Sequence, residues 1–288
     1  MFELVSNQVI APNVHQVRLR APKIATKRRA GQFVIVRTGP GGERVPLTIA
    51  DSDPVAGTIT LVVQAVGRST KMLCELQPGQ YVRDVAGPLG QPTHIEYVGR
   101  VVVIGGGIGT AVALPIAKAM KAAGNQVTAV IGGRSREFVI LEAEMAAVAE
   151  RVLVCTDDGS YGRRGLVTDV LQDLLAAGEK IDLVVAIGPL PMMQAVCDLT
   201  RGPGIRTYVS LNPIMIDGTG MCGGCRVTVG GQVKFACVDG PEFDGHAVDF
   251  VELRSRLSAF REQEAESRRQ YEESCRMDAA ARKLKDQR

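Results

Sequence analysis

The stretch Val101-Val102-Val103-Ile104-Gly105-Gly106-Gly107-Ile108-Gly109 decides the fold of the second half of the chain. Its β-branched run predicts a buried strand, and the glycines after it predict a tight turn into a helix over about 110–123. In this context, backbone amides and a helix N-terminus can hold a pyrophosphate. The motif departs from G-x-G-x-x-G because Ala113 stands one place late for the third glycine. A strand–helix turn without a ligand is the competing interpretation.

Strands and helices alternate after this stretch. Further strands are expected at 127–131, 152–156, 183–187 and 206–211, and further helices at 141–150, 167–177 and 192–199. Such alternation predicts a doubly wound parallel sheet, an α/β domain over residues 99–211. This fold binds ligands at the carboxyl ends of its strands, so we expect a nucleotide there.

The expected nucleotide-binding residues lie in loops at these strand ends. They are Gly105, Gly106, Gly107, Gly109, Thr110, Arg134, Asp157, Asp158, Gly188, Pro189 and Met192. The pair Gly188-Pro189 would shape a turn beneath a nicotinamide. Arg134 and Arg136 follow the second strand, and no acidic residue ends that strand to bond a ribose diol. The residues alone therefore favour NADP(H).

Residues 1–98 have the pattern of a small antiparallel β-barrel. Short alternating or β-branched segments recur at 16–20, 32–37, 58–66 and 81–85, separated by turn residues, and one short helix is expected at 70–76. On an extended strand, Arg44 and Thr48 point to the same side because side chains alternate with a period of two. Such an arginine could pair a flavin diphosphate while the hydroxyl bonds to the isoalloxazine. For Arg44 alone, a surface arginine is the simpler interpretation.

The segment Gly67-Arg68-Ser69-Thr70 opens the short helix and offers a second phosphate cradle. The expected flavin-binding residues are therefore Arg44, Pro46, Leu47, Thr48, Ile49, Gly67, Ser69 and Thr70.

Three of the seven cysteines lie close together near the C-terminal end. The spacing of Asp217, Cys222 and Cys225 reproduces the C-x4-C-x2-C part of the plant-type [2Fe–2S] pattern, with aspartate in the first place. The expected metal ligands are Asp217, Cys222, Cys225 and Cys237. Asp239 is an alternative fourth ligand. A structural zinc is another alternative, although such sites usually have two Cys-x2-Cys knuckles and only one is present.

The composition excludes several classes of protein. A net charge of +3 over 288 residues is too small to indicate binding to nucleic acid or to an anionic membrane. The first residues do not resemble a signal peptide, and the longest apolar runs are only strand-sized. We therefore expect a cytoplasmic protein. The isolated Cys74, Cys155 and Cys197 are expected to be buried and to pack as small hydrophobic residues. Cys275 is expected to be exposed and to have no functional role.

The last segment, residues 248–288, is charged and predicted to be helical. Leu253, Leu257 and Phe260 form one apolar stripe, which fades beyond Arg261. A solvated, partly frayed helix is favoured over a helix that binds a partner.

These motifs carry a resemblance to the ferredoxin–NADP reductase superfamily. Arg44–Thr48 resembles its flavin motif, and Gly105–Gly109 and Gly188-Pro189 resemble its nucleotide loops. Residues 1–250 look like the branch of dihydroorotate dehydrogenase electron-transfer subunits. Within it they are most similar to the small FAD and [2Fe–2S] subunits of NADH-dependent reduced ferredoxin:NADP oxidoreductases, also called sulfide dehydrogenase subunit beta. Asp217 distinguishes them, since the dihydroorotate branch carries cysteine there.

The resemblance implies an oxidoreductase subunit that holds FAD, a [2Fe–2S] cluster and NAD(H), against the preference for NADP(H) drawn from the arginines. It also implies a heterodimer with a large flavin and [4Fe–4S] subunit, electron bifurcation, and an indirect connection to ferredoxin. The cysteine often found before the Gly-Pro pair is Ile187 here, so no catalytic side chain is expected and hydride transfer would rest on stacking geometry.

We therefore expect four segments: a FAD-binding barrel (1–98), an NAD(P)-binding domain (99–211), a [2Fe–2S] module (212–247) and a charged helical extension (248–288). Two other functions remain open. One is the electron-transfer subunit of a dihydroorotate dehydrogenase, and the other is a nucleotide- and zinc-binding sensor that transfers no electrons.

Overall fold

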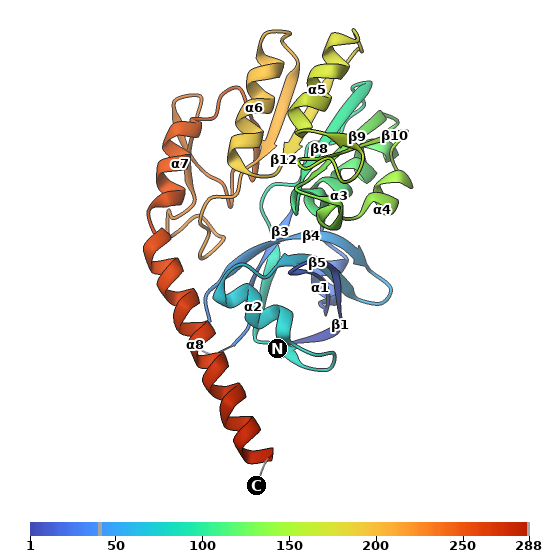
Figure 1. Ribbon diagram of the computed structural model, residues 1–288. Helices are drawn as coiled ribbons and strands as arrows, with labels where there is room; N and C mark the ends of the chain where they lie inside the picture. The colour runs from blue at the N-terminus through green and yellow to red at the C-terminus, as the bar shows by residue number, and fades with distance from the viewer. Residues whose placement is uncertain (40–41, 287–288) are drawn as a thin grey trace.

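The computed structural model describes residues 1–39 and 42–286, with side chains described up to residue 274. In these residues the chain forms an antiparallel barrel, a mostly parallel sheet with helices on both faces, a small hairpin module and two C-terminal helices (Figure 1). The expected combination of a barrel, a doubly wound domain and a small C-terminal module is confirmed.

The barrel strands pair in the order β6-β1-β2-β5-β4-β3-β7. They are β1 (Phe2–Ala11), β2 (Val14–Arg20), β3 (Phe33–Arg37), β4 (Val45–Asp53), β5 (Thr58–Gln64), β6 (Tyr81–Val82) and β7 (Asp84–Leu89). Helices α1 (Pro22–Ala25) and α2 (Arg68–Glu75) belong to the same module. Side chains alternate along the strands, and the inward set is fully buried at Leu4, Leu19, Ile49, Ile59 and Leu61.

Three details of the barrel differ from the sequence prediction. Helix α1 was not expected, because only the short helix at 70–76 was predicted in this half. Strand β1 was not expected, because Ser6-Asn7-Gln8 interrupts its apolar pattern, yet it pairs with β2 along most of its length. The strand expected at 81–85 is two strands, since β6 pairs with β1 and β7 pairs with β3. A bend at Arg83 turns the chain from one partner to the other.

The second sheet has the order β11-β10-β9-β8-β12-β13-β16. Its strands are β8 (Arg100–Gly106), β9 (Gln126–Gly133), β10 (Arg151–Thr156), β11 (Arg163–Arg164), β12 (Leu183–Ile187), β13 (Arg206–Ser210) and β16 (Glu242–Asp244). The helical segments are α3 (Gly109–Ala122), η1 (Arg136–Phe138), α4 (Glu142–Ala146), α5 (Val167–Ala176) and α6 (Leu190–Arg201). Helix α4 is shorter than the helix expected at 141–150. The chain proceeds outward from β8 in one direction and from β12 in the other, so the switch point lies between these strands.

Strand β8 is buried on both faces, as its sequence predicts. Val101 and Val103 pack in the core with α3, whereas Val102 and Ile104 pack in the core with α5 and α6.

The segment after β13 forms the hairpin module. Strands β14 (Arg226–Val229) and β15 (Gln232–Phe235) pair across Gly230-Gly231, both with positive φ. The chain then adds β16 antiparallel to β13, with Val209 opposite Phe243. This strand was not predicted, and it joins the hairpin module to the large sheet.

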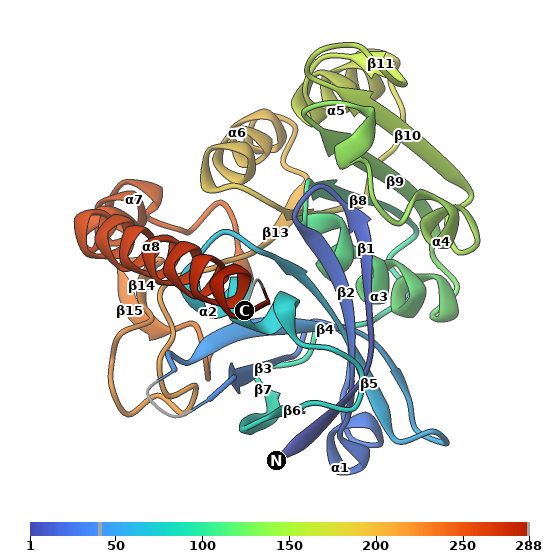
Figure 2. The same ribbon diagram turned by 60° about the horizontal axis from the view of Figure 1, so that its bottom comes forward.

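The C-terminal helices connect the hairpin module to the barrel. Helix α7 (Phe250–Ser258) is capped by Asp249, whose side chain accepts the N–H of Glu252. Helix α8 (Arg261–Asp286) then runs past α2, as Figures 1 and 2 show. Its side chains are mostly exposed up to residue 274, as expected. The contacts with α2 were not expected: Glu272 pairs with Lys71 at 2.6 Å, and the Tyr271 hydroxyl donates to Glu75 at 2.6 Å.

No helix in the described part of the chain combines the length and apolar character needed to cross a membrane.

The linker between the barrel and the large sheet contacts all three modules. The backbone N–H of Thr93 donates to Ala30 of the barrel at 2.9 Å. The N–H of Gln91 donates to Gly240 of the hairpin module at 2.6 Å, and its side chain donates to Val238 at 2.8 Å. These bonds fix the hairpin module relative to the barrel.

A carboxyl group lies at the centre of this junction. Thr93 Oγ1 donates to Glu242 Oε1 at 2.5 Å. Gly31 has φ +81°, and a Cβ there would lie 2.7 Å from Glu242 Oε1, so the backbone packs directly on the carboxyl. Burial takes the Glu242 carboxyl out of water and raises its pKa to about 7, although the hydrogen bond from Thr93 acts in the opposite direction.

We expect Glu242 to make stability depend on pH. Its pKa rises from 4.5 to about 7 on folding, so between these values the folded chain binds more protons than the unfolded chain. The free energy of unfolding should fall by at most about 3 kcal/mol as pH rises through this window and then level off. Urea unfolding across the window measures it. Glu242→Gln should flatten the slope, whereas the exposed Glu137→Gln should keep it; an unchanged slope in Glu242→Gln would contradict this assignment.

Candidate functional site

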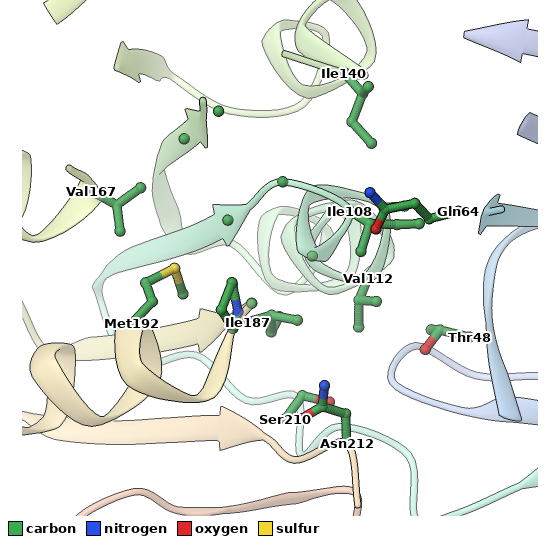
Figure 3. Close-up of a pocket in the computed structure, with 18 of the residues that line it drawn as sticks. Thr48, Gln64, Ile108, Val112, Ile140, Val167, Ile187, Met192, Ser210 and Asn212 are labelled. Atoms are coloured by element: carbon green, nitrogen blue, oxygen red, sulfur yellow. The ribbon is translucent and has the colours of Figure 1, made fainter. Parts of the chain in front are cut away.

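A cavity of about 740 Å³ lies where the barrel faces the carboxyl edge of the large sheet. Its walls come from β4 and β5 of the barrel, from the turns after β8, β9, β10 and β12, and from the segment after β13. Figure 3 shows Thr48 and Gln64 approaching from the barrel, opposite Met192 and Val167. A cavity shared by two domains at a topological switch point is the usual position of a ligand site.

The barrel side of the cavity includes part of the expected flavin motif. Pro46, Leu47 and Thr48 line it. Ile49 does not, because its side chain is fully buried in the barrel core. Arg44 is exposed just before β4 and lies outside the lining.

The N-terminus of α2 lies near Arg44 and also outside the cavity lining. Ser69 Oγ donates to Glu43, the neighbour of Arg44, at 2.9 Å. Thr70 Oγ1 accepts the N–H of Gly67 at 3.0 Å and so caps the helix. The two expected phosphate-binding segments are therefore neighbours, but the role of Arg44, Gly67, Ser69 and Thr70 stays a prediction.

The glycine turn after β8 divides into lining and supporting residues. Gly106, Gly107 and Gly109 line the cavity. Gly105 and Thr110 lie beneath it: a Cβ on Gly105 would be 2.6 Å from Thr110 Cα, and Thr110 is fully buried. These two residues shape the turn, which explains their types without a ligand.

The turn after β12 packs directly on this glycine turn. Gly188, Pro189 and Met192 all line the cavity. A Cβ on Gly106 would lie 2.4 Å from Met192 Sδ, and one on Gly188 would lie 2.8 Å from Met192 Cε. Glycine at both positions therefore lets the Met192 thioether rest on the backbone, at the place where the sequence predicts a nicotinamide.

Two side chains of opposite charge line the cavity where β9 and β10 end. They are Arg134 and Asp157. The N–H of Asp157 donates to Gly133 at 3.1 Å, which brings the end of β10 beside the end of β9. Asp158 lies outside the lining, and hydrogen bonds from Ser160 lower the pKa of its carboxyl. The side chain of Asp157 thus places a carboxylate beside the end of β9, a strand that does not end in an acidic residue of its own.

Sequence reasoning missed four polar side chains of the cavity, one of which is Thr168 in α5. The others are Gln64, Ser210 and Asn212, and Figure 3 shows the last two together at one wall. Ser210 ends β13, so the rule of carboxyl strand ends could have identified this loop. Gln64 has no sequence signal, because a polar residue at a strand end is common.

The aspartate expected as a metal ligand sits in a tight turn. Asp217 accepts the N–H of Thr219 at 2.9 Å and that of Cys222 at 2.7 Å. These bonds, that of Thr219 first, hold the pKa of the carboxyl below its usual value. Cys222 is exposed, and its sulfur accepts the N–H of Gly224 at 3.4 Å.

The other two expected ligands are buried side by side. The Cys225 and Cys237 sulfurs lie 3.2 Å apart. Burial raises the pKa of the Cys237 thiol, so a nearby cation such as iron would be needed to keep it as a thiolate. Among residues 1–39 and 42–274, no three His, Cys, Asp or Glu side chains surround one metal position. The complete ligand set therefore stays a prediction.

The backbone of the cysteine loop fits a close approach to a bound group and to the barrel. Gly218, Gly220 and Gly223 all have positive φ, which side-chain-bearing residues rarely adopt. A Cβ on Gly218 would lie 2.6 Å from Leu89 Cδ1 and 3.0 Å from Ile35 Cγ1. The loop thus packs directly against barrel strands β3 and β7, and this chemistry of soft sulfur ligands on a glycine-rich loop fits an iron–sulfur cluster.

The remaining described cysteines behave as expected. Cys74, Cys155 and Cys197 are buried, and burial raises the pKa of their thiols to about 12, about 11 and about 12. The Cys275 side chain lies outside the described residues.

Two protein families match the chain. The oxidoreductase FAD-binding domain matches residues 1–94. The iron–sulfur cluster binding domain of dihydroorotate dehydrogenase B matches residues 212–249. These matches confirm the predicted FAD and iron–sulfur modules.

Relatives match over almost the whole chain. A dihydroorotate dehydrogenase B (NAD(+)) electron transfer subunit homolog of Thermotoga maritima is 48% identical, over 91% of this chain and 92% of its own. An electron transfer subunit of that enzyme from Geobacillus thermodenitrificans is 34% identical, over 83% and 94%. A chain in the solved NADH-dependent reduced ferredoxin–NADP oxidoreductase is 45% identical with a TM-score of 0.89, over 94% and 98%.

We expect Thr48→Ala to weaken flavin retention. Losing one hydroxyl contact should raise the FAD dissociation constant about three- to tenfold, because a hydrogen bond contributes about 1 kcal/mol. Flavin content after dialysis and the diaphorase rate measure it. Thr168→Ala, at the nucleotide end of the cavity, is the matched control and should keep its flavin. Full FAD content and an unchanged rate in Thr48→Ala would count against the assignment.

We expect Asp217→Cys to assemble a [2Fe–2S] centre with a shifted potential, since a thiolate replaces an oxygen donor. Cys222→Ser should lose the cluster or hold it poorly. Asp239→Asn tests the alternative fourth ligand and should leave the potential unchanged. Redox titration with iron and sulfide assays distinguishes these variants, and an unchanged titration of Asp217→Cys would show that Asp217 is not a ligand.

Proposed function

The chain belongs to the family of dihydroorotate dehydrogenase B electron-transfer subunits and their homologues, and we propose that it connects NAD(H), FAD and a [2Fe–2S] cluster to a partner subunit. As a member it is an electron-transferring oxidoreductase subunit with FAD-binding and iron–sulfur domains. The observation that carries the proposal is the shared cavity. It is lined by the flavin motif, by the nucleotide turns and by the segment that leads from Ser210 towards Asp217.

The residues of the cavity would bind and orient the redox groups. Thr48 and Gln64 offer polar contacts from the barrel, and Ser210 and Asn212 offer them from the opposite wall. None of these four side chains has a hydrogen-bond partner among the described residues. Their hydrogen-bonding groups are therefore available to a ligand in the cavity.

The apolar lining would exclude water. Ile108, Val112 and Ile187 surround the centre of the cavity, and Met192 covers the two glycine turns. The bound nucleotide, flavin and cluster would supply hydride and single-electron chemistry. Ile187 has no proton to exchange, so the protein contributes position and a dry environment.

We propose NAD(H) as the nucleotide. Asp157 lies in the cavity beside the end of β9, where a carboxylate can bond the two ribose hydroxyls. Arg134 is also present and would favour the 2′-phosphate of NADP(H). The solved relative is named for NADH dependence, which favours the carboxylate as the deciding group.

We further propose a partner of a specific kind. The relatives are electron-transfer subunits, so a partner subunit is expected for this chain. The solved relative is an NADH-dependent reduced ferredoxin–NADP oxidoreductase described in a study of flavin-based electron bifurcation. Its 45% identity over 94% of this chain supports a heterodimer with a large flavin and [4Fe–4S] subunit, through which ferredoxin is reached. An iron–sulfur motif needs cysteines that are not in disulfides, which favours the cytoplasm as its compartment. The functional segments proposed are 1–98, 99–211, 212–247 and 248–288.

A second candidate is the electron-transfer subunit of a dihydroorotate dehydrogenase, which the names of two relatives favour. The zinc-sensor alternative has no such support, because the matched family at residues 212–249 binds an iron–sulfur cluster.

Purification without air tests the proposal. We expect a yellow-brown protein with flavin bands, with iron and acid-labile sulfide in proportion, that NADH bleaches faster than NADPH. Co-expression with each candidate large subunit then separates the two assemblies by which one co-purifies. A colourless protein that contains zinc and no flavin would refute the proposal.

A further inference from the structure

Helix α7 reaches the loop between two expected cluster ligands. Arg256 donates from its guanidinium to the carbonyl of Gly224 at 3.3 Å. Gly224 lies between Cys222 and Cys225 and donates its own N–H to the Cys222 sulfur at 3.4 Å. The Arg256 guanidinium therefore binds the same residue whose N–H binds the sulfur of Cys222, an expected metal ligand.

Arg256 is partly buried, and no carboxylate lies within ion-pairing distance of it in the described part of the chain. Glu252 stands one helical turn earlier on α7, yet makes no ion pair with it. Leaving a partly buried cation uncompensated is unfavourable, so the arrangement calls for a negative group nearby.

A second, exposed arginine lies beside the same loop. Arg226, on β14, places its Nη1 3.2 Å from where a Cβ of Gly223 would stand. It too has no carboxylate partner among the described residues. Two arginines that form no ion pair with any described side chain thus lie beside Gly223-Gly224, the two residues between the cysteines.

Helix α7 is anchored so that Arg256 stays in this position. The N–H of Asp249 donates to Thr228 of the hairpin at 2.9 Å, and Leu253 is buried in the shared core. The matched iron–sulfur domain ends at residue 249, one residue before α7 begins. Arg256 therefore lies outside the domain that the family defines.

We propose that Arg256, assisted by Arg226, is a positioning residue that holds the Cys222–Cys225 turn and raises the reduction potential of the cluster. The inference rests on the proposed function. A [2Fe–2S] centre gains one negative charge when it takes up one electron, and a fixed cation close by favours the reduced form. The hydrogen bond to Gly224 also stiffens the loop that carries two ligands.

Arg256→Gln is the direct test, and Arg254→Gln is its control. Arg254 is on the same helix, two residues away, but donates to Gln194 instead of the cluster loop. Redox titration of the anaerobic full-length protein, followed by the visible spectrum and electron paramagnetic resonance, gives the midpoint. In Arg256→Gln the ratio of reduced to oxidised cluster at a fixed solution potential should fall about tenfold. Arg254→Gln should stay within about twofold of the wild type, because Arg254 is exposed and bonds to Gln194 of α6 and not to the loop.

Arg256→Lys separates charge from hydrogen-bond geometry. A lysine keeps the positive charge but not the planar fork, so its midpoint should stay close to that of the wild type. Equal shifts in the lysine and glutamine variants, or no shift in the glutamine variant, would overturn the electrostatic role. If both variants lost iron, Arg226→Gln would decide: a lowered midpoint supports the proposal and an unchanged one overturns it.

Iron and sulfide content of the wild type separates this inference from the function itself. A wild-type protein without iron would contradict the proposed function. If the wild type contains the cluster and the Arg256→Gln variant has the same midpoint potential, only the role of Arg256 is contradicted.

Discussion

One shared hydrophobic core holds the barrel, the large sheet and the hairpin module in fixed relative positions. Phe33 and Ile35 of the barrel belong to the same buried core as Met215, Cys225 and Cys237 of the cysteine module and the inner face of the large sheet. Since a close-packed core resists deformation, the cysteine loop cannot shift relative to the barrel without opening it. Electron transfer between a flavin and a cluster depends on a fixed separation, and this shared core is what would maintain it.

The hairpin module, which carries the cysteine loop, is joined to the large sheet by β16, although its strands β14 and β15 form a separate sheet. Strand β16 extends the sheet beside β13, and the segment between β13 and the cysteines forms a wall of the cavity. Ser210 and Asn212 therefore belong both to the cavity and to the approach to Asp217. Met215, two residues before Asp217, also lines the cavity, so a displacement of the cysteine loop would be transmitted to the cavity.

The C-terminal helices connect the cysteine loop to the barrel. Helix α7 contacts the cysteine loop through Arg256, and α8 contacts α2 of the barrel through Lys71–Glu272 and Tyr271–Glu75. The surface ion pair by itself contributes little to stability. Its importance is geometric, because the helix spans from the cysteine module to the end of the barrel where a flavin phosphate is expected.

The sequence by itself determined the features that depend on neighbouring residues: the buried strand and glycine turn of 101–109, the spacing of Asp217, Cys222 and Cys225, and the alternation of strands and helices. These follow from periodicity and turn chemistry, which are local. Only the tertiary structure decided that β16 joins the sheet, that Gln64 and Asn212 face one cavity, and that Arg256 reaches Gly224. Each of these contacts joins segments far apart in the chain, and no local pattern records such a pairing.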